Sequence, residues 1–189
     1  MRGCSEHELV AGLRRGEAAA LDEAYARYRD RIFGFLSRLA GRRDLAEDLF
    51  QETWLKLARH ATTLREDTEL GAWLYTVARN QFRSHRRWHA LDDQRLRQFA
   101  ATPPAAIDAE EQADARGALD VLEAALASLP ASAREVLLLI AVEGLLPEQA
   151  ARILGIEYDA VRQRLSRARA LLAERMEIAE RRRAAGGRR

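Results

Sequence analysis

The clearest indication of the fold comes from two neighbouring stretches, PEQAARILGI (Pro147–Ile156) and AVRQRLSRARALL (Ala160–Leu172). Pro147 suits the first turn of a helix, and Gly155 suits a sharp turn in which the backbone takes a positive φ. Apolar residues recur at helical spacing in the second stretch and predict a buried stripe, Val161, Leu165, Ala168 and Leu172. The two stretches together predict a helix-turn-helix.

Polar residues remain on the other side of the second helix, namely Arg162, Gln163, Ser166, Arg167 and Arg169. In a recognition helix, such side chains contact base edges and phosphates in the major groove of DNA. An ordinary helical hairpin is the alternative, but it rarely presents five polar residues, three of them arginine, on one face.

The rest of the chain also has helical periodicity, with four prolines among 189 residues and no convincing strand. The fold class is therefore all-α, with two small helical domains joined by a flexible linker. We expect a first domain at 1–89, an acidic linker at 90–114 that contains Pro103 and Pro104, a second domain at 115–180 and a disordered basic tail at 181–189. Ser5 with Glu8 predicts a capping box for a short first helix.

Composition excludes several classes of protein. No apolar stretch approaches the roughly 18 residues that a membrane span needs, so we expect no membrane insertion. The single cysteine, Cys4, excludes an internal disulfide and a cysteine-based zinc site, and the cytoplasm is the expected compartment. Charge along the chain is basic, then acidic, then basic, which suggests two contacts with a polyanion.

Acidic residues mark one face of the helix expected within DLAEDLFQETWLKL (Asp44–Leu57), with Asp44 as its cap. The core side carries Ala46, Phe50, Thr53 and Leu57. The opposite side carries, at spacing i, i+3, i+4 and i+7, Asp48, Gln51, Glu52 and Leu55. A leucine among carboxylates suits a docking surface for a basic partner, but the pattern alone favours a solvated face with one exposed leucine.

Arginines form a stripe within AWLYTVARNQFRSHRR (Ala72–Arg87), together with Thr76: Arg79, Arg83, Arg86 and Arg87. Four arginines this close repel one another, which favours an anionic partner over a solubilising role. Tyr75 and Phe82 border the stripe, where they either stack on unpaired bases or belong to the core. The core side is expected to carry Trp73, Leu74, Val77, Ala78 and Trp88.

These motifs resemble a bacterial RNA polymerase sigma factor of the compact extracytoplasmic-function (ECF) group. The resemblance rests on AEDLFQETWLKL, on WLYTVARNQFRSHRR, and on LPASAREVLLLIAVEGL (Leu129–Leu145) followed by the helix-turn-helix, in family order and spacing. It implies a sigma-2-like first domain and a sigma-4-like second domain. It further implies a non-catalytic initiation factor that binds core RNA polymerase, promoter DNA and an anti-sigma factor, and that needs no cofactor or metal.

The resemblance also implies roles for individual residues. Binding of core polymerase falls to Asp48, Gln51, Glu52 and Leu55, which reverses the preference for a solvated face. Contacts with the −10 element fall to Arg79, Asn80, Arg83, Arg86 and Arg87. Contacts with the −35 element fall to Arg162, Gln163, Arg164, Ser166 and Arg167. The loop 60–69 corresponds to the segment that captures a flipped base, and the acidic linker to the one that follows the RNA-exit path.

The recognition helix departs from the family at its start. Glu157 stands where a small hydroxyl residue is usual, Ala160 replaces a threonine, and Arg162 with Gln163 replaces lysine and serine. Asp159 can still cap the helix, whereas Glu157 near a phosphate weakens binding. The family's −35 sequence therefore does not carry over to this chain.

Three other interpretations remain. A sigma-like decoy would bind a regulator and no promoter. A stand-alone helix-turn-helix repressor would leave the Asp48, Gln51 and Glu52 face unexplained. An enzyme finds little support, because the sequence has no glycine-rich phosphate loop, and His85 with His89 lacks an evident third zinc ligand.

Overall fold

The computed structural model describes residues 4–97 and 118–186, and every regular element in these ranges is helical. The N-terminal half contains α1 (Glu6–Arg14), α2 (Ala18–Ala40), α3 (Arg43–His60), the 3-10 turn η1 (Ala61–Thr63) and α4 (Leu70–Arg97). The C-terminal half contains α5 (Ala118–Ser128), α6 (Ala131–Leu137), the π-helical turn η2 (Leu138–Val142), α7 (Pro147–Leu154) and α8 (Tyr158–Gly186). The all-α prediction is confirmed.

Helix ends in the N-terminal half follow local chemistry. The Ser5 hydroxyl accepts a hydrogen bond from the backbone N–H of Glu8 at 3.2 Å, and the Glu8 carboxylate accepts one from the backbone N–H of Ser5 at 2.8 Å, so the predicted capping box is present. Gly41 ends α2 in the left-handed conformation. The prediction that Asp44 caps α3 is wrong, because α3 begins at Arg43 and Asp44 lies in its first turn. A negative charge in this turn interacts favourably with the helix dipole.

The predicted helix-turn-helix is present in the C-terminal half. α7 begins at Pro147 and ends before Gly155, which takes a φ of 63° and turns the chain into α8. Val161 and Ala168 are fully buried on α8. Leu165 and Leu172 are partly buried and pack against the same core, which confirms the predicted stripe.

Two helices extend past their expected boundaries. α4 continues to Arg97, so residues 90–97 of the predicted linker are helical, and the rest of that linker lies outside the described residues. α8 continues to Gly186, into the tail that we expected to be disordered. Residues 90–97 contain Ala, Leu, Gln and Arg, and residues 181–186 contain mainly Arg and Ala. All four residue types favour a helix once it has been nucleated.

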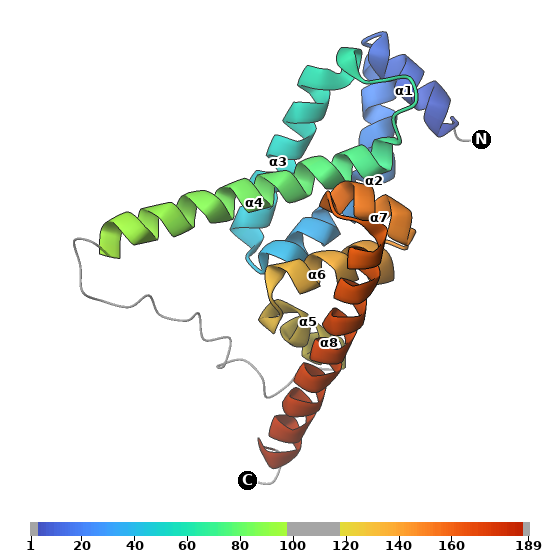
Figure 1. The fold of residues 1–189 in the computed structure, drawn as a ribbon. Helices are drawn as coiled ribbons and strands as arrows, with labels where there is room; N and C mark the ends of the chain where they lie inside the picture. The colour runs from blue at the N-terminus through green and yellow to red at the C-terminus, as the bar shows by residue number, and fades with distance from the viewer. Residues whose placement is uncertain (1–3, 98–117, 187–189) are drawn as a thin grey trace.

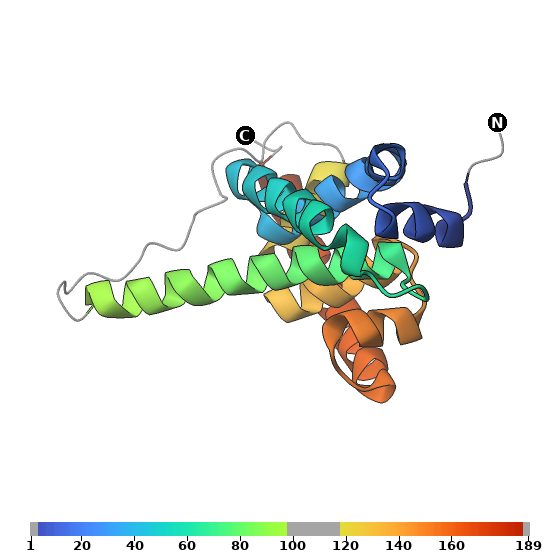
Figure 2. The same cartoon turned by 90° about the horizontal axis from the view of Figure 1, so that it is seen from above.

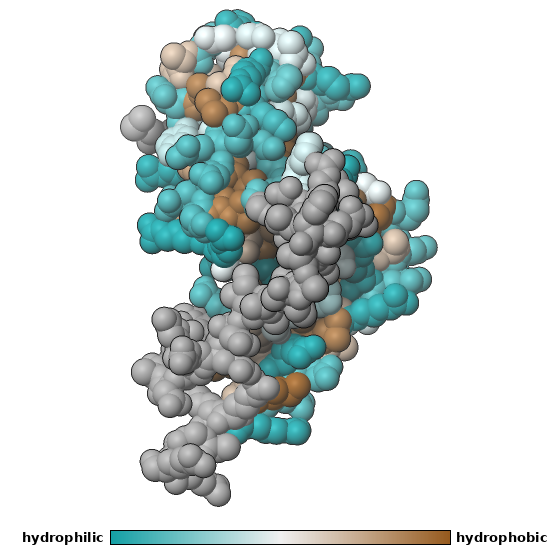
Figure 3. All heavy atoms as spheres, turned by 90° about the vertical axis from the view of Figure 1, so that its left-hand side faces the viewer, coloured by the Kyte–Doolittle hydropathy of each residue, from teal (hydrophilic) through white to brown (hydrophobic). Residues whose placement is uncertain are grey.

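The two halves pack against each other. Figures 1 and 2 both show α7 beside the first part of α4, and α2 also contacts α5, α6 and η2. One continuous hydrophobic cluster contains buried residues from both halves. Hydrophilic residues dominate the described surface in Figure 3. None of the described helices is both long enough and apolar enough to cross a membrane.

Substitution of Gly155 tests whether the turn between α7 and α8 requires a left-handed backbone conformation at this residue. A Cβ atom added there would meet nothing within 4 Å, so the cost of Gly155→Ala is conformational. We expect this variant to lose about 1–2 kcal/mol of unfolding free energy, because the left-handed conformation is strained for alanine. Gly155→Asn is the matched control, since asparagine tolerates this conformation. Urea unfolding followed by circular dichroism measures both, and equal stability of wild type and Gly155→Ala contradicts the assignment.

Candidate polymerase and nucleic-acid interfaces

The acidic face of α3 points to solvent. We call it the docking face: Asp48, Gln51, Glu52 and Leu55, all exposed. Leu55 has 47% of its surface accessible. That other side buries Ala46, Leu49, Thr53 and Leu57, and the Thr53 hydroxyl donates to the carbonyl of Leu49 at 2.7 Å. The predicted division of α3 into two sides is confirmed, although Phe50 is only partly buried.

Aromatic side chains flank the docking face, and the periodicity did not reveal them. Tyr25 of α2 has 41% of its surface accessible. Its ring contacts that of Trp54 edge-on, with the centroids 4.8 Å apart. The Trp54 Nε1 atom is buried and has no hydrogen-bond partner among the described residues. An apolar surface therefore continues from Leu55 toward α2.

The arginine stripe of α4 is partly exposed and partly buried. Asn80, Arg83, Arg86 and Arg87 are exposed. Tyr75 and Phe82 are both buried, so the structure places them in the core and not beside unpaired bases. Tyr75 packs edge-on against Phe35, with a centroid distance of 5.3 Å.

Trp88 does not lie on the core side as predicted, because 70% of its surface is accessible. The C-terminal part of α4 projects past the packed body of the molecule (Figure 1). Helical periodicity alone continues the core stripe to Trp88, but the packed body ends before it.

Arg79 is buried against the C-terminal half. Its Nε atom lies 2.9 Å from the Glu135 Oε2 atom of α6, and each side chain is only 5% exposed. Its NH1 atom also donates to the carbonyl of Ile153 at 3.1 Å. In this arrangement Arg79 is not available to DNA, unlike the other stripe arginines.

Glu143 makes a second polar contact between the halves. Its carboxylate accepts hydrogen bonds from the Tyr75 hydroxyl and from Arg31 Nε, and the latter distance is 3.2 Å. Arg31 also donates to the backbone carbonyl of Glu143 at 2.8 Å. Burial, followed by the hydrogen bond to Glu143, raises the pKa of Tyr75, so its hydroxyl remains a donor. The π-helical turn η2 ends immediately before Glu143.

A third contact lies nearer the surface. The Glu69 carboxylate accepts from Arg152 NH2 at 2.5 Å and from Gln149 Nε2 at 3.1 Å. Glu69 belongs to the loop before α4, while the other two residues belong to α7. The loop 60–69 is thereby tied to the helix-turn-helix in this arrangement.

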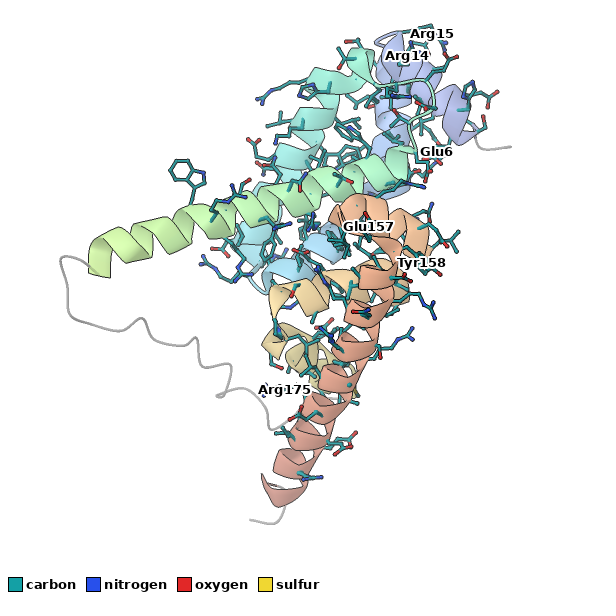
Figure 4. The ribbon with its side chains drawn as sticks, viewed as in Figure 1. Glu6, Arg14, Arg15, Glu157, Tyr158 and Arg175 are labelled. Carbon is teal, nitrogen blue, oxygen red and sulfur yellow. The ribbon has the colours of Figure 1, made fainter. Side chains whose placement is uncertain are left out.

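The recognition helix α8 presents its polar residues as predicted. Arg162, Gln163, Ser166 and Arg167 are exposed and line one hollow together with Asp159. Arg164 is half-buried at the edge of the apolar stripe. The prediction that Asp159 caps this helix is wrong, because α8 begins at Tyr158 and Asp159 lies in its first turn. Figure 4 labels Glu157 and Tyr158 where the turn enters α8.

The structure offers no metal centre in the part of the chain that it describes. There, no group of three or more His, Cys, Asp or Glu residues is placed to hold a metal ion. His85 lies on α4, and the side chain of His89 falls outside the described residues.

Comparison with known proteins assigns the chain to a family. Residues 24–90 match the model of sigma-70 region 2, and residues 119–172 match that of sigma-70 region 4. The chain is 33% identical to the ECF RNA polymerase sigma factor EcfG of Rhodopseudomonas palustris over 74% of its own length and 75% of that protein. It is 35% identical to the RNA polymerase sigma factor CarQ of Myxococcus xanthus over 82% of its own length and 87% of that protein.

The chain belongs to the ECF group of the sigma-70 family. Region 2 of this sigma factor contains the docking face and the arginine stripe, and region 4 contains the helix-turn-helix.

Solved structures extend the likeness to the arrangement of the halves. The sigma factor RpoE from Bartonella quintana, in complex with the anti-sigma factor NepR, matches with a TM-score of 0.69 and 29% identity. That match covers 83% of this chain and 96% of RpoE, which is more than either half contains. CnrH in complex with the cytosolic domain of CnrY has the same fold, with a TM-score of 0.68 and 22% identity over 92% of this chain and 97% of CnrH.

The buried ion pair of Arg79 and Glu135 can be tested through its effect on the unfolding free energy. Breaking a buried ion pair by removing one partner costs about 3–5 kcal/mol, whereas replacing both by apolar residues is often neutral. We expect Glu135→Leu alone to lower the unfolding free energy strongly, and Arg79→Met with Glu135→Leu to recover most of the loss. Urea unfolding of the wild type, both single variants and the double variant completes the cycle. Additive losses contradict a direct coupling between the two residues.

Proposed function

We propose that this ECF sigma factor binds core RNA polymerase through the docking face of α3 and directs it to promoters through α4 and α8. The observation that carries the proposal is the docking face itself, because an exposed leucine among an amide and two carboxylates suits a basic protein surface. A factor that only binds DNA would have no use for this face. The protein would act in the cytoplasm and would catalyse no reaction itself.

Promoter contacts follow from the two basic helices. On α4, the exposed Asn80, Arg83, Arg86 and Arg87 would contact the −10 element. On α8, Arg162, Gln163, Ser166 and Arg167, with Arg164 at their edge, would contact the −35 element. Guanidinium groups bind phosphates and pair with guanine in a bidentate manner, so both helices supply affinity and α8 supplies sequence preference.

Use of Arg79 at the −10 element would require the two halves to separate. The Arg79 side chain is enclosed and paired with Glu135, and it reaches DNA only after that pair breaks. The sigma factor RpoE from Bartonella quintana is found with the anti-sigma factor NepR, and its likeness covers both halves of this chain. We therefore expect an anti-sigma factor to bind this protein as well, in a docked arrangement of regions 2 and 4.

Charge reversal tests the docking face. We expect Glu52→Lys to weaken the binding of core RNA polymerase by roughly tenfold or more, because a new positive charge would face a basic partner surface. Glu177→Lys is the matched control, since Glu177 is an exposed residue of α8 far along the chain from α3. Titration of labelled protein with core polymerase gives the affinities, and circular dichroism confirms equal helicity.

Two results contradict this assignment. Unchanged affinity of a folded Glu52→Lys variant removes the docking role of the face. Failure of the wild type to bind core polymerase at all favours a sigma-like decoy that binds a regulator.

Substitution of Arg162 tests promoter reading. We expect Arg162→Ala to relax the preference at one −35 base pair by about 1–3 kcal/mol, which is the discrimination of a bidentate base contact. Arg175→Ala, farther along α8 (Figure 4), is the control for loss of one positive charge. Holoenzyme binding to promoters with single base changes measures the preference. A uniform loss on all promoters would instead identify Arg162 as a phosphate contact.

A further inference from the structure

Five arginines from both halves line a single cleft. Arg79, Arg83, Arg86 and Arg87 come from α4, and Arg164 comes from α8 on the opposite side. The cleft has a volume of about 630 Å³, and we call it the arginine cleft. It exists only while regions 2 and 4 are docked, because its two walls belong to different halves of the chain.

Among the residues that the structure describes, the positive charge in the arginine cleft is largely uncompensated. Glu135 is the carboxylate in its wall, and it is already paired with Arg79. Among the described residues, no carboxylate forms an ion pair with the guanidinium groups of the other four arginines, Arg83, Arg86, Arg87 and Arg164. Guanidinium groups that share a cleft repel one another, so the docked arrangement carries an electrostatic cost that a bound anion would remove.

Arg134 gives an independent sign of this excess charge. Its side chain is half-buried and donates through NH1 to the carbonyl of Leu39 at 2.9 Å, while its Nε atom is buried without a partner among the described residues. Burial lowers the pKa of Arg134, and the nearby charge of Arg86 lowers it further. The surroundings of the cleft are therefore electropositive beyond its own lining.

We propose that the arginine cleft binds a compact polyphosphate anion, which holds regions 2 and 4 together. Guanidinium groups bind phosphate oxygens in a bidentate manner, and a chain of three or four phosphates has enough oxygens for several arginines at once. The volume is within the range of about 300–1,000 Å³ of small-ligand sites, so a compact anion fits and a DNA duplex does not. Leu154 and Ile156 form an apolar part of the wall that can also take the base of a nucleotide.

Such a ligand would oppose promoter binding. It binds the docked arrangement and not the separated halves, so it raises the docked population by its differential affinity. It also occupies Arg83, Arg86 and Arg87, which the −10 element would need. The proposal goes beyond the function as a sigma factor, because it adds a small-molecule site that regulates that function.

Titration calorimetry of the full chain with inorganic tripolyphosphate, at constant ionic strength, tests the site. We expect saturable binding of one anion per chain and roughly tenfold weaker binding for Arg87→Gln and for Arg164→Gln. Arg175→Gln removes an equal charge from α8 outside the cleft and should leave the affinity unchanged. Equal losses of affinity for all three variants would overturn the proposal, because the anion would then respond only to the net charge of the chain. Tripolyphosphate binding no stronger than the binding of two separate orthophosphates would overturn it as well.

Glu143→Gln tests whether the site depends on docking. Glu143 joins the halves but does not line the cleft, so all five arginines remain. Simple electrostatics predicts tighter anion binding when a nearby carboxylate is removed, whereas loss of docking predicts weaker binding. We expect at least about fivefold weaker binding, with Glu177→Gln as the matched control. Unchanged or tighter binding by Glu143→Gln overturns the proposal.

Spin labels report the arrangement directly. Cys4 is exposed and is the only cysteine of the chain, so Glu177→Cys provides a second site on α8. We expect tripolyphosphate to narrow the distribution of distances between the labels toward the docked value, and no change overturns the proposal. The same experiment with a nucleoside triphosphate shows whether the base adds affinity. Binding of either anion at the arginine cleft supports the proposed site. Neither polymerase nor promoter is present, so the result is independent of the proposed sigma function.

Discussion

The buried pair of Arg79 and Glu135 determines how the two halves of this sigma factor meet. Each side chain is 5% exposed, so the charges have lost nearly all contact with water. Such a pair is tolerated only when its geometry is good and its remaining donors are satisfied, and here Arg79 also reaches the carbonyl of Ile153. Apolar packing alone would allow region 4 to slide on α4. The pair instead fixes one register, and the Glu143 and Glu69 contacts fit around it.

Periodicity and local chemistry predicted much of what lies within each half. The two sides of α3 follow from apolar residues at helical spacing, and Leu55 was correctly placed on the exposed side. Pro147 and Gly155 located the helix-turn-helix, because each residue suits one backbone conformation. The polar face of α8 followed from the same reasoning.

The contacts between the halves could not be predicted in this way. A helical wheel shows which residues share a face but not what that face meets, so Arg79 could not be told apart from Arg83 one turn later. Tyr75 and Phe82 were left open for the same reason, and Arg31 was not recognised at all. The ends of α4 and α8 were placed too early because the chain there lacks apolar periodicity, whereas a helix that is already nucleated can continue through such residues.

The fluorescence of Trp88 can be distinguished from that of the other tryptophans. Of the three tryptophans in the chain, Trp54 and Trp73 are partly enclosed, while the Trp88 indole is 70% exposed on the projecting end of α4. An indole in water emits at longer wavelength than one in an apolar setting, and a soluble quencher reaches it first. The emission therefore has one component from the packed body and another from the exposed part of α4 around Trp88. Any partner that covers this part of α4 alters the second component and leaves the first unchanged.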